Sequence, residues 1–103
     1  MYKIVVFVPN EHKEQVKSAM FKAGAGKVGN YDKVCFETPG VGQFRPCEGS
    51  TPFMGQESEI SRIKEVKIEM VCSEELLDHV IHAIEKSHPY ETPAFDIIRT
   101  CKR

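Results

Sequence analysis

The run of residues that begins at His88 reads His-Pro-Tyr-Glu-Thr-Pro, and it brings an imidazole, a phenol and a carboxylate together. Pro89 and Pro93 restrict the backbone around these groups. A histidine near the C-terminal end of a helix is favoured as a cation, so Glu91 could pair with His88. The segment has two interpretations. It is a ligand site formed by His88, Tyr90 and Glu91, or it is a structural cap that ends a helix and orients the next strand.

His88 and Glu91 could also supply two of the ligands of a divalent metal ion. A metal site needs a third ligand, which could come from Cys35, from another residue or from a second subunit. The four cysteines lie at positions 35, 47, 72 and 101, without the Cys-x-x-Cys spacing of zinc knuckles and redox sites. We therefore expect reduced thiols, and the sequence suggests no cofactor other than this divalent metal.

Three glycines, Gly24, Gly26 and Gly29, spell the Gly-x-Gly-x-x-Gly pattern of dinucleotide-binding proteins. That pattern binds a pyrophosphate where the glycines follow a strand and open a helix, whereas these glycines follow a predicted helix. We interpret them as a structural turn that needs positive φ angles. The alternative is an anion-binding loop in which Lys27 contacts the ligand.

The remaining histidines, His12, His79 and His82, are expected on the surface. His79 and His82 are three residues apart, which is not the spacing of four that places two zinc ligands on one helical face. No order of serine, cysteine, histidine and aspartate is distinctive enough to nominate a nucleophile. We therefore predict no catalytic residue and no enzymatic activity.

Hydrophobic periodicity predicts the elements that position these groups. Apolar residues alternate or run together in the strands, and they recur every three to four residues in the two helices, for which Asn10 and Ser73 are the expected N-caps. The predicted strands are Tyr2–Val8, Tyr31–Thr38, Ile60–Cys72 and Ala94–Thr100, and the predicted helices run from Asn10 to about Ala23 and from Ser73 to Pro89. This β-α-β-β-α-β order indicates an α+β fold of the ferredoxin-like type, a four-stranded antiparallel sheet with two helices on one face.

The segment from Pro39 to Gly55 is rich in glycine and proline, which argues against a helix or a central strand. Residues 43–45 could pair briefly along a sheet edge. Phe44, Phe53 and Met54 are unfavourable in water, so we expect them to pack on this subunit, on a neighbouring subunit or over a ligand. The sequence leaves the path of this loop open.

Length and composition describe one globular domain that spans residues 1–103. Lys and Arg total 14 against 15 Asp and Glu, and this net charge of -1 argues against nucleic acid as a partner. The apolar run Ile4–Val8 is too short to cross a membrane, and no secretory leader is evident, so we expect a cytoplasmic protein. Four apolar residues, Val5, Phe7, Phe95 and Ile97, are expected on the open face of the sheet, which predicts self-association.

Several ordered motifs run through nearly the whole chain. They are Gly24-Ala-Gly-Lys-Val-Gly-Asn-Tyr31; Cys35-Phe36; Gly40-x-Gly42-x-Phe44-x-Pro46-x-x-Gly49-x-x-Pro52-x-x-Gly55; Glu65-x-Lys67-Ile68-Glu69; and His88-Pro-Tyr-Glu-x-Pro-Ala-x-Asp96. By these motifs the chain resembles the YqfO-type domain that is inserted in Nif-three-like proteins (Ngg-interacting-factor relatives) and that also occurs alone. The His-Pro-Tyr-Glu-x-Pro segment alone is also similar to CutA, the divalent-cation-tolerance protein, and the general architecture is similar to that of the PII signalling proteins.

This resemblance implies a small oligomeric binding or regulatory module without catalytic activity of its own. CutA and PII proteins are ferredoxin-like trimers, so the resemblance implies a homo-oligomer and specifically a trimer. The alternative is a CutA-like divalent-metal-binding protein, or an enzyme built at subunit interfaces from His88 and Glu91. Full-length Nif-three-like proteins hold their paired metals in a flanking domain, so their hydrolase labels do not apply to 103 residues.

Three positions depart from the pattern of the family that the chain resembles. Thr92 stands where glutamate is common, Phe95 where tyrosine is common, and Lys67 where arginine is usual. A lysine cannot make the two parallel hydrogen bonds of a guanidinium group. A family site that uses the second carboxylate, the phenol or the guanidinium is therefore not expected in this chain.

Overall fold

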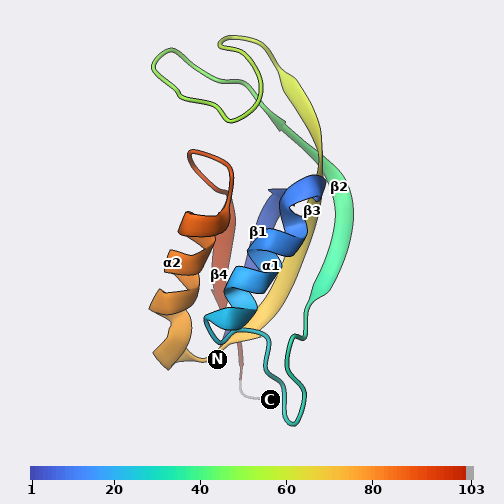
Figure 1. Ribbon diagram of the computed structural model, residues 1–103, viewed down its shortest axis with the longest axis vertical. Coiled ribbons are helices and arrows are strands. Elements are labelled where there is room, and N and C mark those ends of the chain that lie inside the picture. The colour runs from blue at the N-terminus through green and yellow to red at the C-terminus, as the bar shows by residue number, and fades with distance from the viewer. Residues whose placement is uncertain (102–103) are drawn as a thin grey trace.

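The computed structural model describes residues 1–101, which fold in the predicted β-α-β-β-α-β order. The strands are β1 (Tyr2–Pro9), β2 (Phe36–Phe44), β3 (Ser61–Cys72) and β4 (Phe95–Arg99), and the helices are α1 (Lys13–Lys22) and α2 (Leu77–Ser87). Each helix follows a short 3-10 turn, η1 (Asn10–His12) or η2 (Glu74–Leu76). Both helices cover one face of the sheet, as the ferredoxin-like prediction requires (Figure 1).

The sheet is antiparallel throughout, with the strand order β2-β3-β1-β4. β1 lies between two partners, because Val6 pairs with Ile68 of β3 and with Phe95 of β4. Directly paired residues share a face of the sheet, so this row of apolar side chains points toward the helices. A β-branched, almost wholly apolar strand suits this central position.

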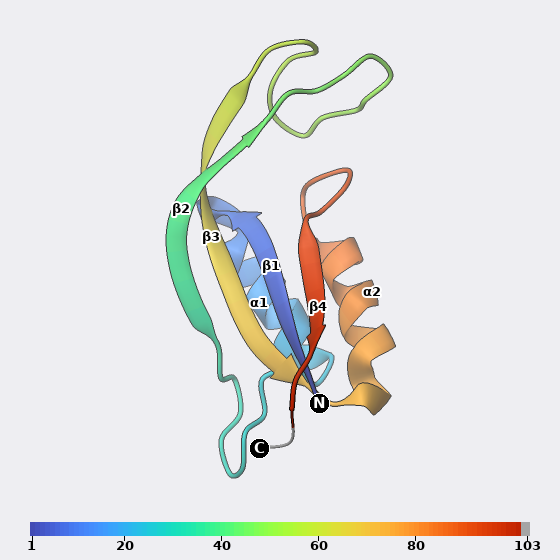
Figure 2. The same ribbon diagram turned by 180° about the vertical axis from the view of Figure 1, so that it is seen from behind.

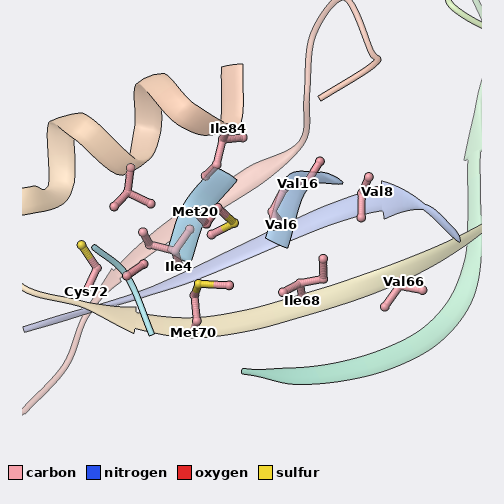
Figure 3. Close-up of a cluster of buried hydrophobic side chains, with 12 residues drawn as sticks. Ile4, Val6, Val8, Val16, Met20, Val66, Ile68, Met70, Cys72 and Ile84 are labelled. Atoms are coloured by element: carbon pink, nitrogen blue, oxygen red, sulfur yellow. The ribbon is translucent and has the colours of Figure 1, made fainter. Parts of the chain in front are cut away.

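The core fills the space between the sheet and the two helices (Figure 3). Alternate residues of β1 and β3 meet the apolar stripes of α1 and α2 there. The side chains with no exposed surface are those of Ile4, Val6, Val8, Val16, Met20, Ile68, Val80 and Ile84. Burying one such side chain contributes about 1.5 to 3 kcal/mol, which makes this cluster the main source of stability.

The second strand lies further along the chain than predicted. We expected it over Tyr31–Thr38, but β2 spans Phe36–Phe44. Lys33 has a φ of 56°, in the left-handed region that stops a strand, and Val28 and Tyr31 form an isolated bridge instead. β2 is an outer strand of the sheet, where Pro39 and the neighbouring glycines are tolerated.

Two further local expectations were wrong. Within the described residues, neither Asn10 nor Ser73 caps a helix with its side chain, and the chain enters each helix through a 3-10 turn instead. Phe95 and Ile97 do not lie on the open face, because they pair with Val6 and Ile4 on the helix-covered side.

In residues 1–101 neither helix has the length and hydropathy that a bilayer span requires.

The open face of the sheet, which the helices do not cover, is turned toward the viewer in Figure 2. Strand pairing places both charged and apolar side chains on it. Lys3 and Glu69 form an ion pair of 2.8 Å across it. Phe36 pairs with Glu69 and Ile98 pairs with Lys3, which places both apolar side chains on this face. Phe36 is 67% exposed and Ile98 is 48% exposed. The face therefore keeps uncovered apolar surface at Phe36 and Ile98, whereas of the four predicted residues only Val5 and Phe7 face this side.

The glycine-rich turn after α1 has the predicted positive φ angles, which are 110° at Gly24, 80° at Gly26 and 57° at Gly29. Gly26 donates its N–H to the carbonyl oxygen of Val71 at 2.8 Å, and its own carbonyl accepts the N–H of Val34 at 2.8 Å. These bonds join the turn to the C-terminal end of β3. The predicted positive φ angles are therefore confirmed, and they agree with the interpretation of the three glycines as a structural turn.

Gly26→Ala should destabilise the protein by about 1 to 3 kcal/mol, because a left-handed φ disfavours a side chain and a Cβ would overlap the Phe21 ring and the Val34 carbonyl. Gly29→Ala is the matched control, since its Cβ would meet no heavy atom within 4 Å in the described chain. We expect a clearly smaller loss there, of about 1 kcal/mol. Denaturant midpoints measure both. Equal midpoints for the two variants would show that the close contacts at Gly26 are unimportant.

Candidate functional site

The segment after α2 turns away from the helix at a proline. His88 has an extended backbone, with φ of -75° and ψ of 136°, as the residue before a proline favours. Its N–H still donates to the carbonyl oxygen of Ile84 at 2.9 Å, which closes the last turn of α2. The following residues then cross to the start of β4, above the end of β1 (Figure 1). This local geometry agrees with the interpretation of the segment as a structural cap.

The imidazole of His88 is buried and uses both of its nitrogens. Its Nε2 lies 2.6 Å from the carbonyl oxygen of Phe7, and its Nδ1 accepts the N–H of Tyr90 at 3.1 Å. A ring that accepts at Nδ1 must donate from Nε2, so this histidine is neutral. Burial lowers the pKa of His88, against smaller opposing contributions from the Phe7 carbonyl and Glu65. The expected cation paired with Glu91 was wrong, because a charged ring would lose the bond from Tyr90.

The phenol of Tyr90 is directed at β3. Its hydroxyl donates to Oε2 of Glu65 at 2.7 Å. Burial and the acceptor carboxylate both raise the pKa of Tyr90, so the phenol stays protonated. Gly42 of β2 makes room for this bond, because a Cβ at position 42 would overlap the Glu65 carboxylate. The hydrogen bond between Tyr90 and Glu65 therefore depends on β2, on β3 and on the segment 88–94, which lie far apart in the sequence.

The carboxylate of Glu91 holds the long loop between β2 and β3. Its Oε1 accepts the backbone N–H of Thr51 at 2.7 Å. The loop also closes on itself, since Ser58 donates its N–H to the carbonyl oxygen of Pro46 at 2.7 Å. Residues 45–60 consequently bend back toward the segment 88–94, as both ribbon views show (Figures 1 and 2). The path that the sequence left open is thus a return over the end of the sheet.

Aromatic rings gather between this loop and the segment 88–94. The ring centroid of Tyr90 lies 5.8 Å from that of Phe44, 6.4 Å from that of Phe53 and 5.0 Å from that of His88. His12 meets Phe53 edge-on at 5.3 Å. Phe44 and Phe53 therefore pack within this subunit, which was one of the alternatives for the loop.

A half-open cavity of about 270 Å³ lies beneath the loop, and we call it the aromatic hollow. Its wall consists of Phe7, Gly42, Gln43, Phe44, Pro46, Ser50, Pro52, Phe53, Met54, Glu65, Tyr90, Glu91, Thr92 and Ala94. Most of this wall is apolar, and two carboxylates are its charged groups. Such a concave, mainly apolar surface with a few polar groups is typical of a small-molecule site.

The structure brings only some of the predicted site residues together. His88, Tyr90 and Glu91 lie at or directly beneath the hollow, with Pro89 and Pro93 fixing the backbone between them. Lys27 lies elsewhere, because its neighbour Gly26 is bonded to Val71, six residues along β3 from Glu65. Six residues of a strand span about 20 Å. Lys27 therefore cannot contact a ligand held by Glu65 and Tyr90 in this subunit.

Cys35 is also separated from His88. It directly precedes β2, the outer strand, whereas His88 is bonded to β1 on the other side of β3. In the part of the chain that the structure describes, no three His, Cys, Asp or Glu side chains are grouped as metal ligands. A metal site made of Cys35, His88 and Glu91 of a single subunit was therefore wrong. A metal held between subunits stays a prediction.

Ion pairs that connect β2 to α1 lie close to Cys35. Glu37 accepts hydrogen bonds from Lys13 at 2.9 Å and from Lys17 at 2.6 Å, and these pairs tie β2 to α1. Burial raises the pKa of Cys35, so its thiol is kept in the less reactive protonated form. The other three cysteines are likewise free thiols. These ion pairs were not predicted, since they depend on where β2 begins.

Known proteins are similar to this chain in sequence and in fold. No family model matches this chain. It is 45% identical over 97 residues to the GTP cyclohydrolase 1 type 2 homolog of Halalkalibacterium halodurans, and 43% identical over 95 residues to the Bacillus subtilis protein of that name. The structure of a Bacillus cereus protein related to NIF3 matches with a TM-score of 0.80 at 40% identity. The resemblance to Nif-three-like proteins is confirmed.

These matches cover nearly all of this chain and a minor part of each relative. They span 94% and 92% of the chain but 26% of each of the two relatives, and 94% of the chain but 24% of the Bacillus cereus protein. The chain thus spans about a quarter of the length of its Nif-three-like relatives.

Shorter proteins share the fold at low identity. A variant of CutA1 from Pyrococcus horikoshii matches with a TM-score of 0.71 at 19% identity, over 100% of this chain and 86% of that protein. The PII-like protein CutA from Nostoc matches with a TM-score of 0.69, also at 19% identity, over 97% of this chain and 81% of that protein. The predicted CutA-like and PII-like architecture is confirmed.

The neutral state of His88 predicts a pH dependence. Because burial lowers the pKa of His88 in the folded state, the unfolded chain takes up this proton first. Its contribution to stability is therefore complete above about pH 6.5, the ordinary value for histidine, and declines as the pH falls further. Glu37 and Glu69, whose pKa values are lowered by their lysine partners, lose their contributions only at more acidic pH.

Denaturant titrations of wild type and His88→Gln between pH 7.5 and 5 measure this effect. The glutamine keeps a donor for the Phe7 carbonyl and has no proton to gain in this range. We expect a lower stability for the variant at pH 7.5 and a shallower fall toward pH 5. Parallel curves for the two proteins would contradict a neutral, buried His88.

Proposed function

We propose that this chain is a non-catalytic binding module, which works as a homo-oligomer in the cytoplasm and takes its ligand in the aromatic hollow. One observation carries the proposal. The polar groups of the segment 88–91, for which the sequence left a ligand site and a structural cap as alternatives, are engaged in hydrogen bonds that hold the wall of the hollow in place. They build a cavity rather than a reaction centre.

A metal-handling or catalytic function has less support. A metal ion at His88 would need one of the two ring nitrogens that now bond to Phe7 and Tyr90. The protonated phenol of Tyr90 is a poor general base near neutral pH, because its pKa is raised. The relatives named GTP cyclohydrolase 1 type 2 homolog are about four times as long as this chain, so their similarity supports a shared domain and not a shared reaction.

Self-association is supported by the uncovered apolar surface of the open sheet face. Phe36 and Ile98 are large apolar side chains that remain 67% and 48% exposed in one subunit. The outer edge of β2 is also unpaired in the described chain, and such edges invite pairing with another strand. The assembly we propose is a trimer that covers the part of each open face around Phe36 and Ile98 and leaves the hollow accessible.

Light scattering at micromolar concentration should therefore report a mass above that of the 11.7 kDa monomer, with a trimer expected. Phe36→Lys should shift the protein to monomer with little loss of monomer stability, because this side chain is already exposed. Val41→Lys is the matched control, since Val41 is 69% exposed on the same strand but alternates to the other face. A monomeric wild type, or equal effects of both variants, would contradict association through the open face.

A fragment screen followed by ligand-observed NMR tests whether the hollow binds small molecules. We expect fragments whose binding is weakened at least fivefold by Ala94→Leu, which adds three carbon atoms to the wall. Ser18→Leu adds similar bulk to the exposed face of α1 and should leave binding unchanged. The screen includes zinc and copper chlorides. A metal-induced rise in Tm that disappears in both His88→Ala and Glu91→Ala would instead favour metal handling.

A further inference from the structure

The charge of the aromatic hollow is one-sided. Glu65 and Glu91 line it, and its wall contains no lysine, arginine or histidine among the described residues. Both carboxylates are hydrogen bonded, yet their donors are the neutral Tyr90 hydroxyl and the neutral Thr51 N–H. The hydrogen bonds position the two negative charges without neutralising them.

Basic residues lie close to the hollow, but within residues 1–101 none of them forms an ion pair with Glu65 or Glu91. Lys67 follows Glu65 by two residues on the same face of β3 and lines a neighbouring cavity with it. Arg45 lies between Phe44 and Pro46 of the wall but is not itself part of the wall. His12 packs edge-on against Phe53, outside the wall. The lysines that do pair, Lys3, Lys13 and Lys17, are bonded to other glutamates. Two unpaired carboxylates in a half-enclosed apolar site make a negative potential.

Aromatic rings add to this preference. Phe44 and Phe53 flank Tyr90 with ring centroids 5.8 and 6.4 Å from its own. The faces of aromatic rings carry partial negative charge and attract cations, most strongly where water is partly excluded. A phosphate or carboxylate group would meet both carboxylates without a basic side chain to bind it. The hollow therefore disfavours anions and suits a group that is both cationic and apolar.

We propose that the aromatic hollow binds a small organic ammonium ion, a primary or quaternary amine carried on an apolar or aromatic body. The ammonium group lies between the carboxylates of Glu65 and Glu91, and the apolar body packs on the rings of Phe44 and Phe53. The volume of about 270 Å³ is slightly below the range of drug-sized sites, which limits the ligand to a small molecule. This proposal rests on the proposed function of the hollow as a binding site.

Three probes of similar size separate charge from shape. They are phenethylamine, which is a cation at pH 7, 2-phenylethanol, which is neutral, and 3-phenylpropionate, which is an anion. NMR titrations at 20 mM salt should give an affinity for phenethylamine at least tenfold higher than for 2-phenylethanol, with the anion weakest. The preference for the cation should shrink at 500 mM salt, because salt screens exposed charges.

Charge-removing variants locate the effect. Glu65→Gln and Glu91→Gln keep a hydrogen-bond acceptor, and each should weaken phenethylamine binding about fivefold, a typical size for one electrostatic contact at a partly exposed site. Binding of 2-phenylethanol should not change. Glu57→Gln is the matched control, since it removes the same charge from the same loop outside the wall. Thermal melting checks that each variant is folded. If Glu65→Gln does not fold, Glu91→Gln still tests the proposal, because it leaves the hydrogen bond between Tyr90 and Glu65 intact.

The outcomes distinguish the two proposals. Equal binding of phenethylamine and 2-phenylethanol, with both lost in Ala94→Leu, would overturn the cation preference and leave the hollow as a binding site. A loss of phenethylamine binding in Glu57→Gln as large as in Glu91→Gln would reduce the effect to net charge and overturn the assignment. Failure of all three probes to bind at 10 mM would overturn the ligand class, and the fragment screen alone would then decide whether the hollow binds anything.

Discussion

The neutral imidazole of His88 is the contact on which the rest of the site depends. It donates to the Phe7 carbonyl of β1 and accepts the N–H of Tyr90, so one buried ring connects the central strand, the end of α2 and the segment that follows. A buried polar group that satisfies both of its nitrogens stabilises one backbone path, whereas one left unpaired would be strongly unfavourable. The direction of the Tyr90 side chain follows from this path.

The long hairpin of β2 and β3 supplies the opposite wall. β2 can approach closely because Gly42 leaves space for the Glu65 carboxylate, which in turn holds the Tyr90 hydroxyl. The loop at the tip of the hairpin is long, but closing a long loop adds little entropic penalty beyond that of a short one. Within residues 1–101, the hydrogen bond from Thr51 to Glu91 and the packing of Phe53 on Tyr90 and His12 hold it against the rest of the protein.

The sequence predicted the fold more fully than the site, because periodicity reports which side of an element is buried. It placed Val5 and Phe7 of β1 on the open face, where they pair with Glu69 and Lys67. It failed at β2, because glycine and proline argue against a strand except at the edge of a sheet. The segment from His88 to Glu91 could be recognised as a candidate site from its imidazole, phenol and carboxylate alone. Glu65 was not, because its alternation with Lys67 and Glu69 is that of any solvated strand face.

Register explains most of the remaining differences. Cys35 and Lys27 were grouped with His88 by chemistry, but the strand order places β3 between Cys35 and His88, and the register places the turn with Lys27 near the far end of β3. Neither separation can be computed before the pairing of strands is known. The same holds for Phe95, whose burial depends on pairing with Val6. The residue types suggested candidate site residues, and the pairing of strands far apart in the sequence determines which of them lie close together.

The two ends of the described chain lie together, far from the hollow, and this arrangement suits a domain that matches about a quarter of longer relatives. Thr100 donates its backbone N–H and its hydroxyl to the carbonyl oxygen of Met1, so the first residue and the end of β4 lie side by side. A domain whose ends are adjacent can be inserted into another chain with little disturbance. The loop that covers the hollow lies at the other end of the molecule (Figure 1). Segments attached at these two ends would therefore leave the domain at the end of the molecule opposite the hollow.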